Sequence, residues 1–582
     1  MKIVTGFVLL CSTCAWAADP FDFNRLDAQA QRRGQQQAEN VAERLKPQTD
    51  VRFAKPQDEL TSLPSNESPC FSIHKILLNE YAEYQSERVA SRFQWALSRA
   101  VEDLHFSLPY CLGNNGLTVL MKRIQHHLIE AGYITTRVVA EEQDLSTGVL
   151  KLTVIPGVIR HTLIEDKSSV ARFSRLTAWS GLAFREGDLL NIRDIEQSLE
   201  NLRRLPTADA VINIVPVEDD ATAVGESDVA IRYKQAFPFR LNLNVDDSGT
   251  KATGKWQGTV AGSLDGVITA NDLFYYSLTH SMKRPHWTGE DDKGAHSSKS
   301  MNYYYSIPFG YWQFSASHYE YNYHQQVAAA YGSTVDYAGE SRISKLTLSR
   351  LVFRNSQHKI TLSGSVWLRD SRNFFEHQEV DVQRRRTAGW EVGFNHKAYL
   401  GNTILELNAN YKRGTGAANA MRAPEEVYGK GTSRMQIITA NIAITKAFSL
   451  FSESFQLNSS LAAQWNRTPL VLQDRFSLGG RYTIRGTDGE LTLTGERGYL
   501  WRNELAWNMA HRGHWLYVTL DHGAVRGPST QNFLGRSMTG TSVGLRGTVN
   551  HLYYDVFAGK ALHVPRGFNQ DPVIGFNIGL SF

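Results

Sequence analysis

The sequence predicts a mainly β membrane protein, with a C-terminal transmembrane β-barrel of about 16 strands. Two repeated α+β units and an N-terminal helix are expected to precede the barrel. Apolar and polar residues alternate with a period of two in many segments between Phe237 and the terminal Phe582. After the N-terminus, no apolar run approaches the roughly 20 residues that a membrane-spanning helix needs. The 24 Tyr, 27 Phe and 12 Trp fit a barrel with aromatic residues at both membrane interfaces.

Residues 1–17 are typical of a secretory signal peptide. Lys2 supplies the positive charge, an apolar stretch follows, and an A-x-A cleavage site ends at Ala17. Lipidation at Cys11 or Cys14 is the weaker alternative, because the residues before them fit a lipoprotein signal poorly. The mature protein is therefore expected to be exported.

Residues 18–45 are rich in Gln, Arg, Glu and Ala, and this composition favours a helix. Its apolar face is thin, so a hydrophobic core cannot hold such a helix. It is either a mobile surface segment or a polar rod inside a wet cavity. Residues 46–67, which include Pro47, Pro56 and Pro64, are typical of an extended linker.

Two successive units, residues 68–156 and 157–234, repeat one order of segments: a strand, two helices and two strands. The second helix of the second unit has an apolar stripe at steps of three and four. The stripe consists of Ile192, Ile195, Leu199 and Leu202. Asn191 is well placed as the N-cap of this helix, and Asp194 favours its positive start.

Cys70 and Cys111 are the two cysteines that follow the signal peptide. Two cysteines in an exported chain predict one disulfide. In the chain-entropy model, closing a loop of about 40 residues contributes roughly 4 kcal/mol. Two reduced, buried thiols are the alternative, and a metal site has too few ligands.

Residues 235–582 are expected to form the barrel. A soluble β-sandwich could show the same alternation. Helical segments are nearly absent, however, and one face of each strand is too polar for a sandwich core. Dividing about 345 residues by about 20 to 22 per strand and connection gives about 16 strands. The terminal Phe582 fits the signal that barrel assembly machinery reads.

Several motifs resemble those of the TpsB transporters of two-partner secretion, the haemolysin and adhesin secretion/activation family. The family's loop signature is usually written V-R-G-Y/F. The matching residues here are Gly479, Gly480, Thr483, Ile484, Arg485 and Gly486, with Gly495 and Gly498 after them. Residues 190–206 resemble the second POTRA domain of the family, and residues 132–137 and 154–157 resemble the first. The resemblance covers the whole mature length and implies two POTRA domains, a 16-stranded barrel and an N-terminal helix that plugs the pore.

The resemblance also implies a role for Arg485 at the tip of a long extracellular loop that folds into the lumen. In the family, this arginine pairs with an aspartate of an F-x-D type motif, for which Asp521 is the candidate. Thr519 stands where the aromatic residue is expected, and Thr487 replaces the aromatic after Gly486. A guanidinium can hold a carboxylate through two parallel hydrogen bonds, and glycine permits a tight turn beside it. A solvated arginine in a glycine-rich hairpin is the alternative.

Together these features predict a translocator of the bacterial outer membrane that is not an enzyme. It would bind an unfolded, exported TpsA-type partner in the periplasm, by an exposed sheet edge or an adjacent groove, and secrete it through the pore. The resemblance leaves open a haemolysin, an adhesin or a contact-dependent inhibition toxin as cargo. Further expected partners are outer-membrane lipid and, during biogenesis, barrel assembly machinery and periplasmic chaperones.

Other functional classes are less well supported. The balance of 62 basic and 58 acidic residues does not indicate nucleic acid, and no nucleotide-binding motif or cofactor site is found. A barrel-assembly insertase of the same superfamily would be expected to carry more POTRA units. An outer-membrane phospholipase would need a Ser/His constellation, and a passive porin would have no use for two periplasmic units.

Three local patterns have ordinary interpretations. Residues 540–544 spell G-x-S-x-G, but strand-like alternation follows them, whereas a nucleophile elbow needs a helix there. His126 and His127 are adjacent on a predicted helix, so their side chains diverge, and we expect a solvated pair. The acidic residues 290–292 are expected in a polar loop between strands rather than in a calcium site.

Overall fold

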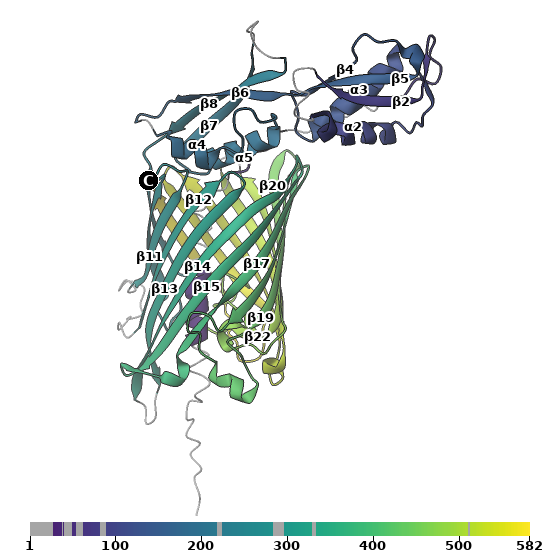
Figure 1. Cartoon of the computed structure of the whole chain (residues 1–582). Helices are drawn as coiled ribbons and strands as arrows, with labels where there is room; N and C mark the ends of the chain where they lie inside the picture. Colours follow the sequence, from purple (N-terminus) through teal and green to yellow (C-terminus); the bar gives the residue numbers. More distant parts are fainter. Residues whose placement is uncertain are drawn as a thin grey trace, which may run out of the picture.

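The computed structural model shows a β-barrel with two smaller α/β units at one end (Figure 1). The structure describes residues 27–37, 39, 49–53, 62–81, 89–170, 172–217, 224–282, 296–328, 333–509 and 513–582. The expected signal peptide and the acidic residues 290–292 lie outside the described residues. Among the described helices, none has the length and apolar character needed to cross a membrane.

Within the described residues, sixteen strands of eight residues or more form one closed antiparallel barrel. They are β9 (Phe239–Asp246), β10 (Trp256–Asp265), β11 (Leu273–Met282), β12 (Ser297–Phe309), β13 (Trp312–Ala328), β14 (Thr334–Arg354), β15 (His358–Phe375), β17 (Arg385–Leu400), β18 (Thr403–Thr415), β19 (Gln436–Leu450), β20 (Glu453–Asn466), β23 (Arg497–Met509), β24 (His514–Arg526), β25 (Ser537–Val549), β26 (Leu552–His563) and β27 (Val573–Ser581). The last strand, β27, pairs with β9 and closes the barrel. The two-residue β16 (Gln378–Glu379) extends the hairpin at β15. The predicted barrel of about 16 strands is confirmed.

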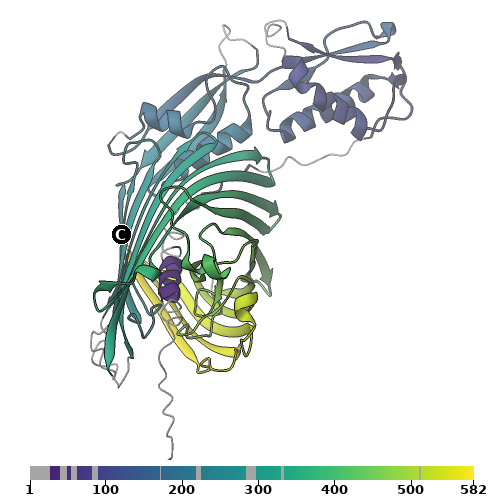
Figure 2. The same ribbon diagram turned by 60° about the horizontal axis from the view of Figure 1, so that its bottom comes forward.

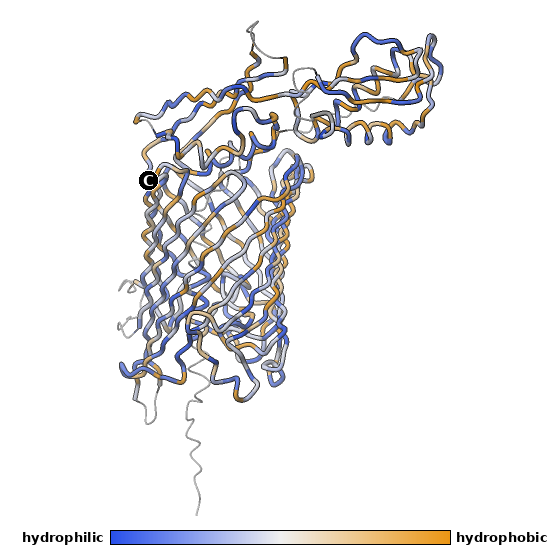
Figure 3. Tube along the Cα trace, viewed as in Figure 1, coloured by the Kyte–Doolittle hydropathy of each residue, from blue (hydrophilic) through white to orange (hydrophobic). Residues whose placement is uncertain are grey.

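Alternation along each strand separates a lumenal face from a lipid-facing one. In β24, Thr519 and Asp521 are buried toward the lumen, whereas Val518 and Leu520 are about half exposed on the outside. Figure 3 shows the same alternation of hydrophilic and hydrophobic residues along the barrel wall. A barrel with an apolar outside and a polar inside suits a membrane, whereas a soluble sandwich would bury its apolar face.

The first periplasmic unit packs two helices against a three-stranded sheet. Its elements are β1 (Phe71–Ile73), β2 (Lys75–Glu80), α2 (Val89–Asp103), β3 (Tyr110–Leu112), α3 (Asn114–Glu130), β4 (Arg137–Val139), the 3-10 turn η2 (Leu145–Thr147) and β5 (Val149–Ile155). The sheet order is β2-β5-β4, with β2 parallel to β5. Its core is apolar, with Phe93, Leu120, Ile124 and Leu152 among the most buried residues.

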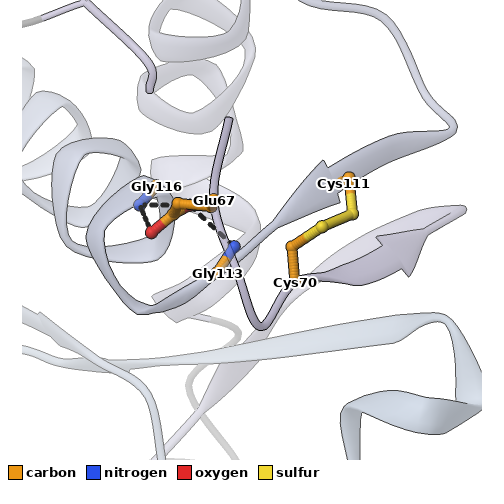
Figure 4. The surroundings of a disulfide bond; sticks show 5 residues. All are labelled: Glu67, Cys70, Cys111, Gly113 and Gly116. Carbon is orange, nitrogen blue, oxygen red and sulfur yellow. Dashed lines mark hydrogen bonds between the residues drawn. A yellow bond between two sulfur atoms is a disulfide. The ribbon is translucent and has the colours of Figure 1, made fainter. Parts of the chain in front are cut away.

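Cys70 and Cys111 form a disulfide with Cα atoms 5.4 Å apart. Figure 4 shows it beside Glu67, whose carboxylate accepts hydrogen bonds from the backbone N–H groups of Gly113 and Gly116 at the start of α3. A carboxylate at this position satisfies amides that a helix N-terminus leaves unpaired. The first strand expected for this unit is observed as two strands, β1 and β2, because the chain breaks at His74.

The expected solvated histidine pair is also wrong. His127 is buried, and its Nε2 lies 3.0 Å from Asp103 of α2. Burial lowers the pKa of His127, although Asp103 opposes that shift. His126 lies 3.5 Å from Glu130. Because α2 packs against α3, the two histidines are packed against neighbouring side chains rather than solvated.

The second unit repeats the architecture in fewer elements. These are β6 (Val158–Asp166), α4 (Arg175–Gly181), α5 (Ile192–Arg203), β7 (Ala208–Pro216) and β8 (Glu226–Gln235). The sheet order is β6-β8-β7, with β6 parallel to β8. The predicted stripe of α5 lies in the core, and the Asn191 side chain accepts a hydrogen bond of 2.8 Å from the backbone N–H of Arg193, which confirms the N-cap.

Helices α4 and α5 lie directly on the periplasmic turns of the barrel (Figure 1). The Arg204 guanidinium donates to the Asn271 carbonyl at 2.7 Å and to the Ser306 hydroxyl at 2.8 Å. The Tyr311 hydroxyl donates to Asp194 at 2.5 Å. Asn271 lies in the turn between β10 and β11, residues 266–272, and this turn contacts the second unit.

A short stretch of the predicted linker, residues 49–53, lies between α5 and the barrel rim. The Asp50 carboxylate contacts Lys359, Lys397 and the hydroxyl of Tyr399. The backbone N–H of Val51 donates to Glu200 of α5 at 2.9 Å. We call residues 49–53 with these partners the linker clamp.

The N-terminal helix, described over residues 27–37, lies inside the barrel (Figure 2). The Tyr323 hydroxyl donates to Asp27 at 2.9 Å, and Ala30 packs against tyrosines of β13 and β14. Gly34 lies so close to this wall that a Cβ there would be 2.4 Å from the Tyr319 hydroxyl. Of the two alternatives for this segment, the polar rod in a cavity is the observed one.

Candidate functional site in the barrel lumen

The chain between β20 and β23 folds back into the barrel and forms the candidate site. It contains the hairpin β21 (Phe476–Leu478) and β22 (Leu493–Gly495). At its base, Arg369 of β15 holds Asp474 through two hydrogen bonds of 3.0 and 3.1 Å. We call residues 467–496 the lumenal loop.

The turn of the lumenal loop is built by hydroxyl groups. The backbone N–H of Gly479 donates to Thr483, and that of Gly480 donates to Thr487, both at 2.7 Å. The Thr487 hydroxyl then donates to the Ile484 carbonyl at 2.7 Å. The threonine that replaces the family's aromatic residue therefore ties the turn by hydrogen bonds instead of by ring packing.

Arg485 lies at the tip of this turn and holds Asp521 of β24. Its Nε donates to Asp521 Oδ2 at 2.8 Å, and its Nη2 donates to Oδ1 at 2.7 Å. The backbone N–H of Arg485 also donates to Asp521, at 2.9 Å. Asp521 is fully buried and the Arg485 side chain nearly so. This two-pronged contact is the geometry in which Arg–carboxylate pairs are strongest.

A second carboxylate, which the sequence did not indicate, completes the arrangement. Arg485 Nη1 donates to Glu504 of β23 at 2.7 Å, and Arg546 of β25 donates to the other Glu504 oxygen at 2.7 Å. We call Arg485, Asp521, Glu504 and Arg546 the lumenal charge cluster. Its two positive and two negative groups alternate, so each buried charge has a partner. Glu504 could have been found only from its position on the lumenal face, two residues after the inward-facing Arg502.

The loop tip lies against the barrel wall with no room for side chains. Gly486 has a φ of 93°, and a Cβ there would be 2.6 Å from the carbonyls of Thr541 and Lys560. On the wall itself, a Cβ at Gly540 would be 2.1 Å from the Arg485 carbonyl. Ile484 is fully buried in an apolar cluster with Leu478, Leu493 and Val525. The G-x-S-x-G segment thus lies on β25, where its first glycine accommodates the lumenal loop.

The remaining predicted residues also lie at contacts of the loop with the wall. Gly495 ends β22 and lies against Val525 of β24, and Gly498 in β23 lies against the ring of Phe476. Thr519, at the position of the expected aromatic, is buried, and its hydroxyl lies 2.7 Å from that of Ser542. The Thr519 side chain therefore contacts β25, and Arg485 pairs with the carboxylates of Asp521 and Glu504.

A polar cavity of about 1080 Å³ borders the lumenal charge cluster. Its lining includes Gln37 of the lumenal helix, Arg485 and Arg502. Helix, loop and strands therefore enclose a cavity with charged residues in its wall rather than a packed core. Among the described residues, no group of three or more His, Cys, Asp or Glu side chains could hold a metal ion.

Comparison with protein-family models gives three matches along the chain. Residues 225–547 match the haemolysin secretion/activation protein family ShlB/FhaC/HecB. Residues 87–157 match the POTRA domain of ShlB type, and residues 158–216 match a POTRA domain.

Individual relatives extend these matches to nearly the full length. The outer membrane transporter CdiB-2 of Burkholderia pseudomallei (strain 1026b) is 30% identical over 95% of this chain and 92% of its own. The hemolysin transporter protein ShlB of Serratia marcescens is 25% identical over 68% of this chain and 67% of its own. The solved structure of CdiB from Acinetobacter baumannii superposes with a TM-score of 0.84 at 29% identity, covering 96% of this chain and 99% of that one.

Proposed function

The chain belongs to the haemolysin secretion/activation protein family ShlB/FhaC/HecB, and we propose that its lumenal loop and helix gate the passage of a secreted partner. As a member of this family it is an outer-membrane transporter of a secreted partner protein, with POTRA domains, and not an enzyme. The proposal concerns how the pore is closed and which partner passes.

The observation that carries the gating proposal is the two-pronged contact between Arg485 and the buried Asp521. Both groups lie in the lumen, where an exported chain must pass. Removing either partner leaves a buried charge unpaired, which costs about 3 kcal/mol or more in a protein interior and less beside the water-filled cavity. The pair therefore holds the loop in one position until something competes for its charges.

The lumenal helix is the second part of the proposed gate. Its contacts with the wall are polar or involve small residues, such as Asp27 and Gly34. Over its described residues 27–37, no continuous apolar face of the helix contacts the barrel, so water can replace these contacts as the helix leaves. A helix held in this way closes a pore and still departs at low cost.

For the partner, we propose an exported protein of the contact-dependent inhibition class. The support is the extent of the likeness: the CdiB relatives align with nearly the whole chain, periplasmic units included, and the haemolysin transporter with about two thirds of it. The POTRA domains would receive this partner in the periplasm while it is unfolded, through a sheet edge or groove.

The Arg485→Ala variant tests the gating proposal by secretion of the partner into the medium. We expect normal amounts of heat-modifiable barrel and a fall in secretion of about tenfold or more, because the loop loses its fixed position. Arg485→Lys keeps the charge but not the two-pronged contact, so its secretion should lie between that of the wild type and that of Arg485→Ala. Arg413→Ala, at an exposed position of β18, is the matched control. Unchanged secretion by Arg485→Ala would refute the gating role.

Single-channel conductance tests the role of the helix. Deletion of residues 19–45 should raise the conductance of the purified protein in planar bilayers. Gly34→Leu should do the same in part, since the added side chain collides with Tyr319 and Tyr321. Gln35→Leu, on the exposed side of the helix, should leave conductance unchanged. A deletion variant as closed as the wild type would show that the helix does not plug the pore.

A further inference from the structure

A row of charged side chains crosses the outer face of the barrel on four neighbouring strands. Cross-strand pairing places Glu320 of β13 opposite Arg342 of β14, Arg342 opposite Asp370 of β15, and Asp370 opposite Arg386 of β17. One step further along, Glu340 stands opposite Arg372. We call these six residues the outer charge row. In the two-residue alternation of the strands they lie on the same face of the sheet as the lipid-facing Leu346 and Leu348, and so they face outward.

The guanidinium groups of Arg342 and Arg372 are held loosely, whereas Arg386 donates to the Ala418 carbonyl at 2.9 Å and to Asp370 at 3.4 Å. Arg342 lies 3.6 Å from Glu320 and 3.8 Å from Glu340, and Arg372 lies 3.5 Å from Asp370. Charge-assisted hydrogen bonds are closer to 2.8 Å, so these donors are not used up. The Arg342 side chain is 56% exposed and those of Arg372 and Arg386 are 37% exposed, against 19% for Asp370 and 25% for Glu320. The three arginines are therefore the groups of the row that are most exposed to a ligand.

Below the row, on the same four strands, lies an apolar groove of about 410 Å³. Its walls are Phe314, Leu346, Leu348, Val366, Trp390 and Val392. Gly364 lies between Leu348 and Val392 in the sheet. A Cβ on Gly364 would meet nothing within 4 Å, so crowding does not require the glycine. The missing side chain instead keeps the groove open.

The spacing of groove and row fits one lipid molecule. Asp370 lies six residues beyond Gly364 along β15, away from the periplasmic turn at residues 355–357, which is about 20 Å of strand. With a strand tilt of about 40°, this becomes about 15 Å of height, or half the hydrocarbon core of a bilayer. A headgroup at the row therefore belongs to the outer leaflet, and its acyl chain ends in the groove at the bilayer centre.

We propose that this surface binds a phosphorylated glycolipid of the outer leaflet, with its phosphates on Arg342, Arg372 and Arg386 and one acyl chain in the groove. The guanidinium groups, spread over three adjacent strands about 5 Å apart, match a headgroup with more than one phosphate. Guanidinium is the side-chain group best suited to bind phosphate through paired hydrogen bonds. The groove adds specificity for a lipid over a free anion.

The test is a titration of the purified full-length protein, in a neutral detergent, with lipid A, a doubly phosphorylated acylated disaccharide. Binding is followed by native mass spectrometry. We expect saturable binding by the wild type and binding weakened about tenfold or more in R342Q/R372Q/R386Q. Gly364→Leu, which fills the groove, should weaken binding as well. Arg350→Gln removes an outward arginine near the periplasmic end of β14 and should bind as the wild type does.

Three outcomes would overturn the proposal. One is wild-type affinity in the triple variant, which would leave the row as cross-strand ion pairs that only support the sheet. Another is equal weakening by Arg350→Gln, which would indicate unspecific attraction. The third is full displacement of lipid A by inorganic phosphate or by phosphatidylethanolamine. Heat-modifiable migration shows whether each variant is folded, and Arg342→Gln alone replaces the triple variant if that one does not fold.

Discussion

Helices α3 and α5 occupy corresponding places in the two periplasmic units, yet they bury different chemistry. Most of the buried side chains of α3 are apolar, as in Leu120, Ile124 and Leu128. Helix α5 buries a similar apolar stripe and, in addition, a polar face. That face consists of Arg193, Glu196, Gln197, Ser198 and Asn201. One fold can thus serve as a free unit or as a docked one, and the second, polar face of the helix makes the difference.

The barrel rim supplies partners for three residues of the polar face of α5, Glu196, Gln197 and Asn201. Arg354, at the end of β14, donates to Glu196 at 3.0 Å, to Glu200 at 2.9 Å and to Gln197 at 3.0 Å. Asn201 donates to the Gly310 carbonyl at 2.8 Å. Buried charges are tolerated when each is paired and hydrogen-bonded. The first unit has an internal disulfide in place of such a network.

The largest effect on this contrast is expected from Arg354→Ala. The change removes the cation that Glu196 and Glu200 share between α5 and the rim, and leaves them Arg193 and Lys359 as partners, at a cost of about 3 to 5 kcal/mol. Amide hydrogen exchange should accelerate in α5 and stay unchanged in α3. Arg232→Ala removes an arginine that is 60% exposed in the same unit and should change neither helix. If α5 remains as protected as in the wild type, the rim network does not hold the second unit.

The apolar stripe of α5 and its N-cap at Asn191 follow from local sequence, because helical periodicity and capping act over a few residues. The burial of the polar face of α5 does not follow from local sequence. Glu196 and Arg354 are 158 residues apart, and a solvated glutamate on a helix has the same local pattern as a buried one. For the same reason the sequence led to a solvated His127, which α2 in fact covers.

The candidate site likewise contains some residues that the sequence identified and others that it did not. The family motif led to Arg485 and Asp521, which lie in contact, while their gating role stays a prediction. The contacts of Glu504 and Arg546 with this pair were not predicted, since the meeting of these side chains depends on strand register across β23, β24 and β25. At the two positions where the family has aromatic residues, Thr487 and Thr519 form hydrogen bonds instead.

A smaller effect, of about 2 to 4 kcal/mol, is expected from replacing both Cys70 and Cys111 by serine. Hydrogen exchange should then accelerate in the first unit, β3 and the start of α3 above all, and leave α5 unchanged. A reducing agent added to the wild type should reproduce the result. Equal acceleration in both units would mean that they unfold together, and the contrast between them would fail.

The smallest effect is expected from Asp194→Asn. Burial raises the pKa of Asp194, although the Tyr311 hydroxyl acts against it. A carboxyl whose pKa is raised on folding stabilises the fold while protonated, and this contribution is lost as pH rises through the folded pKa. The wild type should therefore lose about 1 kcal/mol of folding stability at most as the pH rises from the ordinary pKa of an aspartate, near 3.8, to the raised pKa of Asp194. The difference in melting temperature between variant and wild type, measured across this range, should change with pH; a constant difference would contradict the assignment.

In the proposed gating, the linker clamp is the fixed end of a tether for the lumenal helix. Ten peptide steps separate Glu39, the last helical residue that the structure describes, from Thr49 at the clamp, which gives a reach of about 35 Å. A bilayer core measures about 30 Å, so the helix can clear the barrel while Asp50 stays bound to Lys359 and Lys397. A helix kept this near has a high effective concentration at its own pore. Once the partner has passed, the tethered helix can re-enter the pore without diffusing back to it, and the pore is then closed for the next round of secretion.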